Sequence, residues 1–108
     1  MIALALACAP GDLPWAQAPS PTLQDPEVIR FLALGDVGKG NDTQRRVAAG
    51  AARACALRGC DFVVLLGDNL YPRGMEAPDD PRIEPWIGAM YADTGAPVYL
   101  VLGNHDYG

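Results

Sequence analysis

The chain has 108 residues, of which 50% are hydrophobic and 19% are charged. This composition excludes a disordered tail and a collagen-like repeat. Its 13 acidic residues outnumber the 8 lysines and arginines, and the net charge of -5 disfavours a nucleic-acid binder, because such proteins need a basic surface. No apolar run approaches the roughly 20 residues of a membrane span. The single histidine, His105, excludes a histidine-rich metal site within these residues.

The first 27 residues predict export and an extended linker. Residues 1–8 are a short apolar stretch that ends at Cys8, which is typical of a residual signal segment and loosely of a bacterial lipoprotein site where Cys8 would carry the lipid. Residues 9–27 contain five prolines, each of which disfavours helix, so they predict a linker without a core. We therefore expect an exported protein (periplasmic, secreted or lipid-anchored), with membrane contact only through a lipid on Cys8. A start codon inside a longer signal, or a plain apolar tail, are the alternatives for this segment.

Residues 28–108 predict an α/β domain with the order β-α-β-α-β and mainly parallel strands. Apolar runs at 28–34, 62–66 and 98–102 are typical of strands that are buried on both faces of a parallel sheet. A second, shorter helix is expected at 81–92, with Pro85 in its first turn.

The first helix is predicted over residues 43–58. Asn41 or Asp42 can cap its start, and Gly59 can end it. The apolar face expected to pack on the sheet consists of Val47, Ala51, Ala54 and Cys55. Cys55 and Cys60 either form a disulfide in an exported protein or are two small buried side chains, and the sequence leaves both open.

Each of the three predicted strands ends in a glycine followed by an oxygen-bearing side chain. These side chains are Asp36, Asp68 and Asn104. Ligands bind beyond the carboxyl ends of parallel strands, which lie about 4.8 Å apart, so we expect these three groups to converge. Carboxylate and amide oxygens are hard ligands that suit divalent or trivalent cations. A single Gly-Asp pair is a common turn, but three aligned pairs predict a metal site.

Three short motifs resemble the first motif blocks of the calcineurin-like metallophosphoesterases. They are residues 35–38 (GDVG), 67–71 (GDNLY) and 103–106 (GNHD). The resemblance covers about residues 28–108 and implies the N-terminal part of that family's αββα sandwich, an incomplete phosphoesterase domain.

Two positions resemble the purple, tartrate-resistant acid phosphatase branch in particular. Most of the superfamily has Asp-x-His in the first block, but the third position here is Gly38. Tyr71 stands three residues after Asp68, where the purple acid phosphatases have a replacement metal ligand. Val37 is a departure, since that branch usually has an aromatic residue there.

The resemblance implies a dinuclear metal centre. Asp36 and Tyr71 would bind the first metal, Asp68 would bridge the two metals, and Asn104 would bind the second. The implied cofactors are two metal ions, Fe(III) together with Fe(II), Zn(II) or Mn(II).

The resemblance also implies two catalytic residues. His105 would lie beside the phosphate and either protonate the leaving group or stabilise the transition state, and Asp106 would orient His105 through a hydrogen bond. The implied reaction is metal-dependent hydrolysis of phosphate monoesters of the acid phosphatase type. The substrate would be a small-molecule phosphate ester or a phosphoprotein, and no nucleic-acid partner is expected.

Two alternatives to an acid phosphatase remain open from the sequence. One is another metallophosphoesterase, such as a phosphodiesterase or nucleotidase, and the other is a catalytically inactive metal-binding fragment. The family needs three further histidines, whereas this sequence has only His105. We therefore expect a fragment or a truncated product that needs further residues and is inactive alone.

Overall fold

The computed structural model describes Leu23 and residues 25–107. The lipoprotein-like segment 1–8, with Cys8, lies outside the described residues, as does most of the proline-rich segment 9–27. Within the described part, no helix combines the length and the apolar character that a membrane crossing requires.

The three strands form one parallel sheet in the order β1-β2-β3. The strands are β1 (Phe31–Leu34), β2 (Phe62–Leu65) and β3 (Val98–Leu100), each shorter than the apolar run that predicted it. The register pairs the last residue of β1 with the last of β2, and the last of β2 with the last of β3. The predicted α/β fold with parallel strands is confirmed, and the carboxyl ends of all three strands finish at one edge.

Helices make both crossovers between the strands. The first is α1 (Asp42–Arg58), and the second consists of the successive segments η2 (Glu84–Gly88), α2 (Ala89–Tyr91) and η3 (Ala92–Thr94). The structure therefore divides the predicted second helix into three short pieces. Pro85 stands in the first turn of η2, where its missing N–H costs nothing. The backbone N–H of Ala89 bonds to the carbonyl of Glu84, one residue further back than in an α-helix.

Helix α1 is capped at both ends by residues that the sequence predicted as caps, Asn41 and Gly59. Asn41 is the N-cap, and its side chain accepts a hydrogen bond from the backbone N–H of Gln44. At the other end, the N–H of Gly59 donates to the carbonyl of Cys55, and Gly59 adopts a positive φ of 78°.

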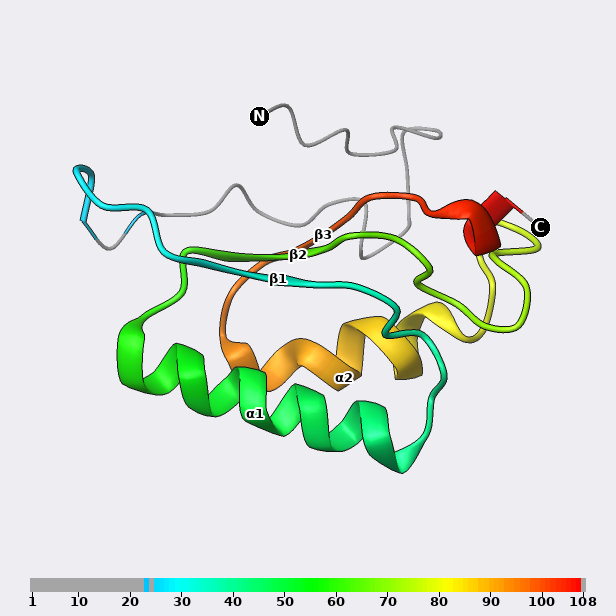
Figure 1. Ribbon diagram of the computed structural model, residues 1–108, viewed down its shortest axis with the longest axis horizontal. Helices are drawn as coiled ribbons and strands as arrows, with labels where there is room; N and C mark the ends of the chain where they lie inside the picture. Colours follow the sequence, from blue (N-terminus) through cyan, green and yellow to red (C-terminus); the bar gives the residue numbers. More distant parts are fainter. Residues whose placement is uncertain (1–22, 24, 108) are drawn as a thin grey trace.

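The helices cover one face of the sheet (Figure 1). The core between them is formed mainly by aliphatic side chains and one tyrosine: Val37, Ala48, Val63, Leu65, Leu70, Ile83, Ile87 and Tyr91.

The buried face of α1 differs in part from the prediction. Gln44, Ala48, Ala51 and Cys55 are buried, whereas Val47 is 42% exposed. Placing Val47 against the sheet was therefore wrong. Gln44 takes the buried position because its amide is satisfied: Oε1 accepts from the N–H of Gly40, and Nε2 donates to the carbonyl of Trp86.

The opposite face of the sheet carries an aromatic row. Phe31 stacks on Phe62 with ring centroids 5.0 Å apart, and Tyr99 meets Phe62 edge-on at 6.0 Å. The prediction that every strand is buried on both faces holds for β2 but is wrong for β1, in which Phe31 is 45% exposed. The reason is that both described crossovers pack on the same face of the sheet.

Cys55 and Cys60 form a disulfide. It joins the last turn of α1 to the segment that enters β2, and it decides between the two alternatives that the sequence left open. A disulfide of this kind is typical of proteins that fold in an oxidising compartment.

Removing this disulfide should lower stability. The bridge closes a loop with a sequence separation of 5 residues, for which chain entropy gives about 2 kcal/mol. We expect a Cys55→Ser/Cys60→Ser protein to lose about that amount in urea unfolding, compared with a Cys8→Ser control that keeps the bridge. In the Cys8→Ser control, thiol titration under denaturing, non-reducing conditions should find no free thiol. Two free thiols in that control would contradict the disulfide.

Candidate active site

The first two site residues have an unusual backbone conformation at the strand ends. Asp36 and Asp68 have φ values of 56° and 53°. This left-handed region is uncommon for residues other than glycine, and such strain is typically kept where function requires a particular side-chain direction. The two turns are also joined, because the N–H of Asp36 donates to the carbonyl of Gly67 at 3.2 Å.

Glycines let the strand ends approach each other closely. A Cβ on Gly67 would lie 2.9 Å from the backbone of Gly103, and a Cβ on Gly103 would collide with the carboxylate and N–H of Asp68. The predicted role of these glycines, a sharp turn with close backbone approach, is therefore what the structure shows.

Gly38 lies against the loop that follows β2. A Cβ at this position would overlap the carbonyl of Asn69, and the N–H of Tyr71 donates to the carbonyl of Gly38 at 2.7 Å. No side chain fits here, so this backbone has no room for the histidine that stands in the first motif block of most of the superfamily. The backbone N–H of Tyr71 is held against residue 38, the position at which that histidine would stand.

Three oxygens from three side chains meet at the edge of the sheet. The hydroxyl of Tyr71 lies 2.8 Å from Oδ1 of Asp36 and 3.1 Å from Oδ2 of Asp68, and these two acceptors share its single hydrogen. The hydrogen bond to Asp36, followed by burial and the bond to Asp68, raises the pKa of Tyr71 well above its ordinary value. The structure thus brings together Asp36, Asp68 and Tyr71, which are three of the four predicted metal ligands.

This oxygen cluster has the chemistry of a hard-cation site. Among Leu23 and residues 25–107, no three His, Cys, Asp or Glu side chains are grouped for a metal ion. The third oxygen of the cluster belongs instead to the phenol of Tyr71, which as a phenolate is a strong ligand for oxophilic cations. The donor set therefore fits one hard cation. Asn104, the fourth predicted ligand, begins η4 (Asn104–Tyr107) with an exposed side chain.

His105 lies directly beside the cluster. Its backbone N–H donates to Oδ1 of Asp68 at 2.9 Å, and its ring centroid lies 4.8 Å from that of Tyr71. The bond from the His105 N–H, aided by Tyr71 and opposed by burial, lowers the pKa of the Asp68 carboxyl below its ordinary value. Asp68 is consequently ionised in mildly acidic solution.

Asp106 has a different role from the one expected. Nδ1 of His105 lies 3.1 Å from the carbonyl oxygen of Pro72, so a backbone carbonyl is its partner in place of Asp106. The carboxylate of Asp106 is buried and accepts four hydrogen bonds. Two come from Asn69, from its backbone N–H and its side-chain Nδ2, and the others come from the backbone N–H groups of Leu70 and Gly103. Asp106 thus fixes the loops after β2 and β3, and the expectation that it orients His105 is corrected.

Sequence reasoning missed two residues at the site. Asn69 is 1% exposed, and its amide also donates to the carbonyl of Val101, so it links the two loops. The ammonium of Lys39 lies over the ring of Tyr71, 5.3 Å from its centroid. Asn69 could have been noted as part of the GDNLY motif, but no sequence signal places Lys39 above Tyr71.

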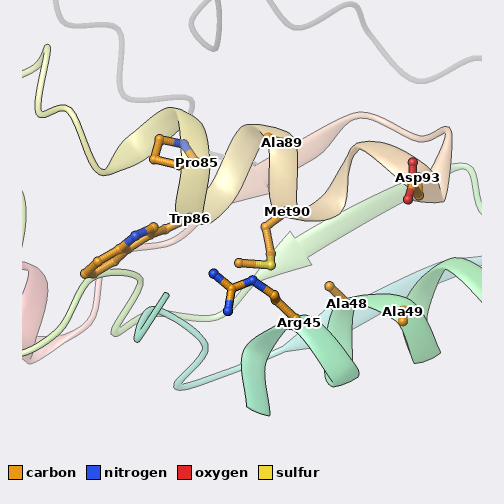
Figure 2. Close-up of a pocket in the computed structure, with 8 residues that line it drawn as sticks. All are labelled: Arg45, Ala48, Ala49, Pro85, Trp86, Ala89, Met90 and Asp93. Atoms are coloured by element: carbon orange, nitrogen blue, oxygen red, sulfur yellow. The ribbon is translucent and has the colours of Figure 1, made fainter. Parts of the chain in front are cut away.

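A separate hollow lies between α1 and the second crossover (Figure 2). Its volume is about 360 Å³, and three of its lining residues come from α1 and five from residues 85–93. None of the site residues lines it. The hollow and the oxygen cluster are therefore distinct features.

Known proteins are similar in sequence to most of the described part of this chain. A family model, calcineurin-like phosphoesterase, matches residues 29–108. Purple acid phosphatase 4 of Arabidopsis thaliana is 42% identical over 82 residues, which are 73% of this chain and 24% of that protein. Tartrate-resistant acid phosphatase type 5 of Oryctolagus cuniculus is 32% identical over 104 residues, which are 88% of this chain and 30% of that protein. The Homo sapiens protein of the same name is 33% identical over 88 residues, 73% of this chain and 27% of its own length. The chain thus spans less than a third of the length of these relatives.

Adding one methyl group at Gly38 should disrupt the loop that carries Tyr71. Gly38→Ala places a Cβ against the Asn69 carbonyl, and we expect a loss of about 3 kcal/mol or more in chemical unfolding, because backbone on both sides must move. Gly50→Ala is the matched control: it lies inside α1 with only a distant contact, and it should gain about 0.5–1 kcal/mol. Equal stability of the two variants would show that residue 38 does not contact this loop.

Proposed function

The chain belongs to the calcineurin-like phosphoesterase family, and we propose that its strand-end site takes part in metal-dependent hydrolysis of phosphate monoesters, of the acid phosphatase type. The observation that carries this proposal is the oxygen cluster of Asp36, Asp68 and Tyr71. The relatives named above are acid phosphatases, and the Gly38–Tyr71 combination supports that branch over phosphodiesterases and nucleotidases. A small-molecule phosphate ester or a phosphoprotein is the proposed substrate.

The proposed metal ligands divide between two ions. Asp36 and Tyr71 would hold the first, Asn104 would hold the second, and Asp68 would be shared by both. We propose Fe(III) for the first ion, because a phenolate and carboxylates suit a hard trivalent cation, and Fe(II), Zn(II) or Mn(II) for the second. When bound, the two ions would supply an acidified water and a clamp for the phosphate oxygens.

His105 is the proposed proton donor. A carbonyl oxygen only accepts hydrogen bonds, so the contact with Pro72 places a hydrogen on Nδ1. Nε2 then carries a hydrogen only when the ring is an imidazolium, and this form can give that proton to the leaving-group oxygen of the ester. The fixed Nδ1 also sets the direction of the ring beside Tyr71. The Pro72 carbonyl thus does for His105 what Asp106 was expected to do.

The second ion is incompletely held by these residues. The proposed set is all oxygen, and the only histidine of the chain is assigned to proton transfer. Nitrogen ligands for the second ion would have to come from other residues. We therefore propose that the chain alone hydrolyses phosphate esters poorly, and a metal-binding role without turnover is the second candidate function.

An oxidising location is also proposed. The Cys55–Cys60 disulfide supports export, because cytosolic thiols are kept reduced. Membrane association is proposed only through a lipid on Cys8.

A visible absorption band should report the role of Tyr71. We expect the iron-loaded protein to be coloured by phenolate-to-Fe(III) charge transfer, and Tyr71→Phe to lose this band while retaining its far-ultraviolet circular dichroism. Tyr107→Phe is the control, since Tyr107 is 78% exposed and outside the cluster. A band that is unchanged in Tyr71→Phe would remove Tyr71 from the metal site.

Substitutions at Asp68 and His105 should separate metal binding from proton transfer. Asp68→Ala should lose both metals by elemental analysis, because the bridging carboxylate is removed. His105→Ala should keep the metals and slow the residual hydrolysis of a chromogenic phosphomonoester by the unsubstituted chain by ~10²–10⁴-fold, as is usual for a lost acid–base group. Loss of metal from His105→Ala would make His105 a ligand and refute the division of roles.

A further inference from the structure

After β2, the chain forms a segment of residues 71–74 that contacts three parts of the site. Tyr71 donates to Asp36 and Asp68, and the carbonyl of Pro72 is the partner of the His105 ring. Two residues later, Gly74 packs so closely on the backbone of Asp106 that a Cβ there would overlap it. Figure 1 shows this segment beside η4 at the edge of the sheet where the strands end. Its path therefore sets the positions of both the phenol and the imidazole.

A pair of charged residues from further along the chain fastens this segment. Asp80 and Arg82, which we call the Asp80–Arg82 clasp, are joined by two side-chain hydrogen bonds of 2.6 and 2.9 Å. The same guanidinium donates to the carbonyl of Gly74 at 2.7 Å and to that of Arg73 at 3.2 Å. The side chain of Asp80 is 3% exposed and that of Arg82 is 23% exposed. Arg82 thus ties two carbonyls of the segment to a buried carboxylate.

The geometry leads us to propose that Arg82 is a positioning residue for the phosphatase site, which acts through the carbonyls of Arg73 and Gly74 to hold Tyr71 and Pro72 in place. This inference rests on the proposed function for its catalytic meaning. Arg82 touches none of the proposed metal ligands and acts only through the segment it fastens.

The physical basis is the fork shape of the guanidinium. Charge-assisted bonds to a carboxylate are about twice as strong as neutral ones, and an arginine can bind a carboxylate and two carbonyls together without losing its planarity. The guanidinium of Arg82 holds the pKa of Asp80 well below its ordinary value. Because the pKa of the Asp80 carboxyl is lower in the folded than in the unfolded chain, the ionised pair stabilises the fold at higher pH. This stabilisation is lost only when the pH falls far enough to protonate Asp80 in the folded state. The clasp is therefore intact in mildly acidic solution.

The simple alternative is that the clasp only stabilises the fold. Asp80 also accepts hydrogen bonds from the N–H groups of Glu76 and Arg82, so it organises its own loop. If the clasp only stabilises the fold, its loss should accelerate amide exchange throughout the domain. If the clasp positions the segment, its loss should first change the amide exchange of Tyr71 and the ring signals of His105.

The test compares Arg82→Lys with the full unsubstituted chain. Lysine keeps the positive charge beside Asp80, but its single ammonium cannot also reach both carbonyls. Arg45→Lys is the matched control, because Arg45 forms an exposed pair with Asp42 on α1, with 61% of its side chain exposed. Should Arg82→Lys fail to fold, the Asp80→Asn/Arg82→Met protein, which leaves no buried unpaired charge, takes its place.

Two measurements on the metal-free chain report local position. His105 is the only histidine, so its ring signals in nuclear magnetic resonance need no assignment among several, and Arg82→Lys should move them toward those of an unstructured histidine. The amide of Tyr71, bonded to the Gly38 carbonyl, should exchange about tenfold faster by local opening. The amide of Val63 in β2 should keep its rate, and Arg45→Lys should change neither signal.

The proposal is overturned if the His105 signals and Tyr71 exchange are unchanged in Arg82→Lys. It is also overturned if Tyr71 and Val63 accelerate equally, which would show a global effect. After iron loading, the charge-transfer band of Arg82→Lys should be shifted or weakened relative to that of Arg45→Lys. Absence of any band in the unsubstituted protein would instead refute the proposed function, while leaving the metal-free result to stand by itself.

Discussion

The candidate site depends on the buried carboxylate of Asp106, which joins the loops after β2 and β3. Its place in a short motif does not indicate this structural role. Asp106 accepts four hydrogen bonds from the loops that leave β2 and β3, and these bonds draw Asn69, Leu70 and Gly103 to one point. Bonds from N–H groups to a charged acceptor are strong, and breaking a buried set leaves several polar groups unsatisfied. With both loops fixed on Asp106, the His105 N–H is placed to bond Asp68.

The glycines explain how the loops can come close enough for these bonds. Gly103 lies against Asp68, and Gly38 lies against the carbonyl of Asn69, each with no space for a side chain. A methyl group at either position would separate neighbouring turns and move a candidate ligand. The short motifs therefore combine chemical residues with the space that those residues need, which is why a Gly-Asp pair becomes informative when it recurs at neighbouring strand ends.

Much of this architecture was predictable because it follows from local rules. Apolar runs gave the three strands, and their parallel order required the residues after them to share an edge. The roles of Gln44 and Asp106 were not predictable, because they depend on partners 36 to 42 residues away in the sequence. The role of Arg82 was not predictable, because it depends on a loop path that periodicity does not encode. Val47 was misplaced for a related reason: the apolar stripe allowed a small rotation of α1, and the satisfied amide of Gln44 fixed the alternative.

In the oxygen cluster, one phenol lies between two carboxylates. Asp36 and Asp68 would repel each other at such an edge, and each already has a strained backbone. The hydroxyl of Tyr71 lies between them and hydrogen-bonds to both, which offsets part of that repulsion and accounts for the raised pKa of the phenol. A cation that replaces the phenolic proton would meet three oxygens already oriented toward one another. The Asp106 bonds and the glycine contacts hold the ligands in place before a cation binds. Binding therefore loses less conformational entropy than it would with mobile ligands.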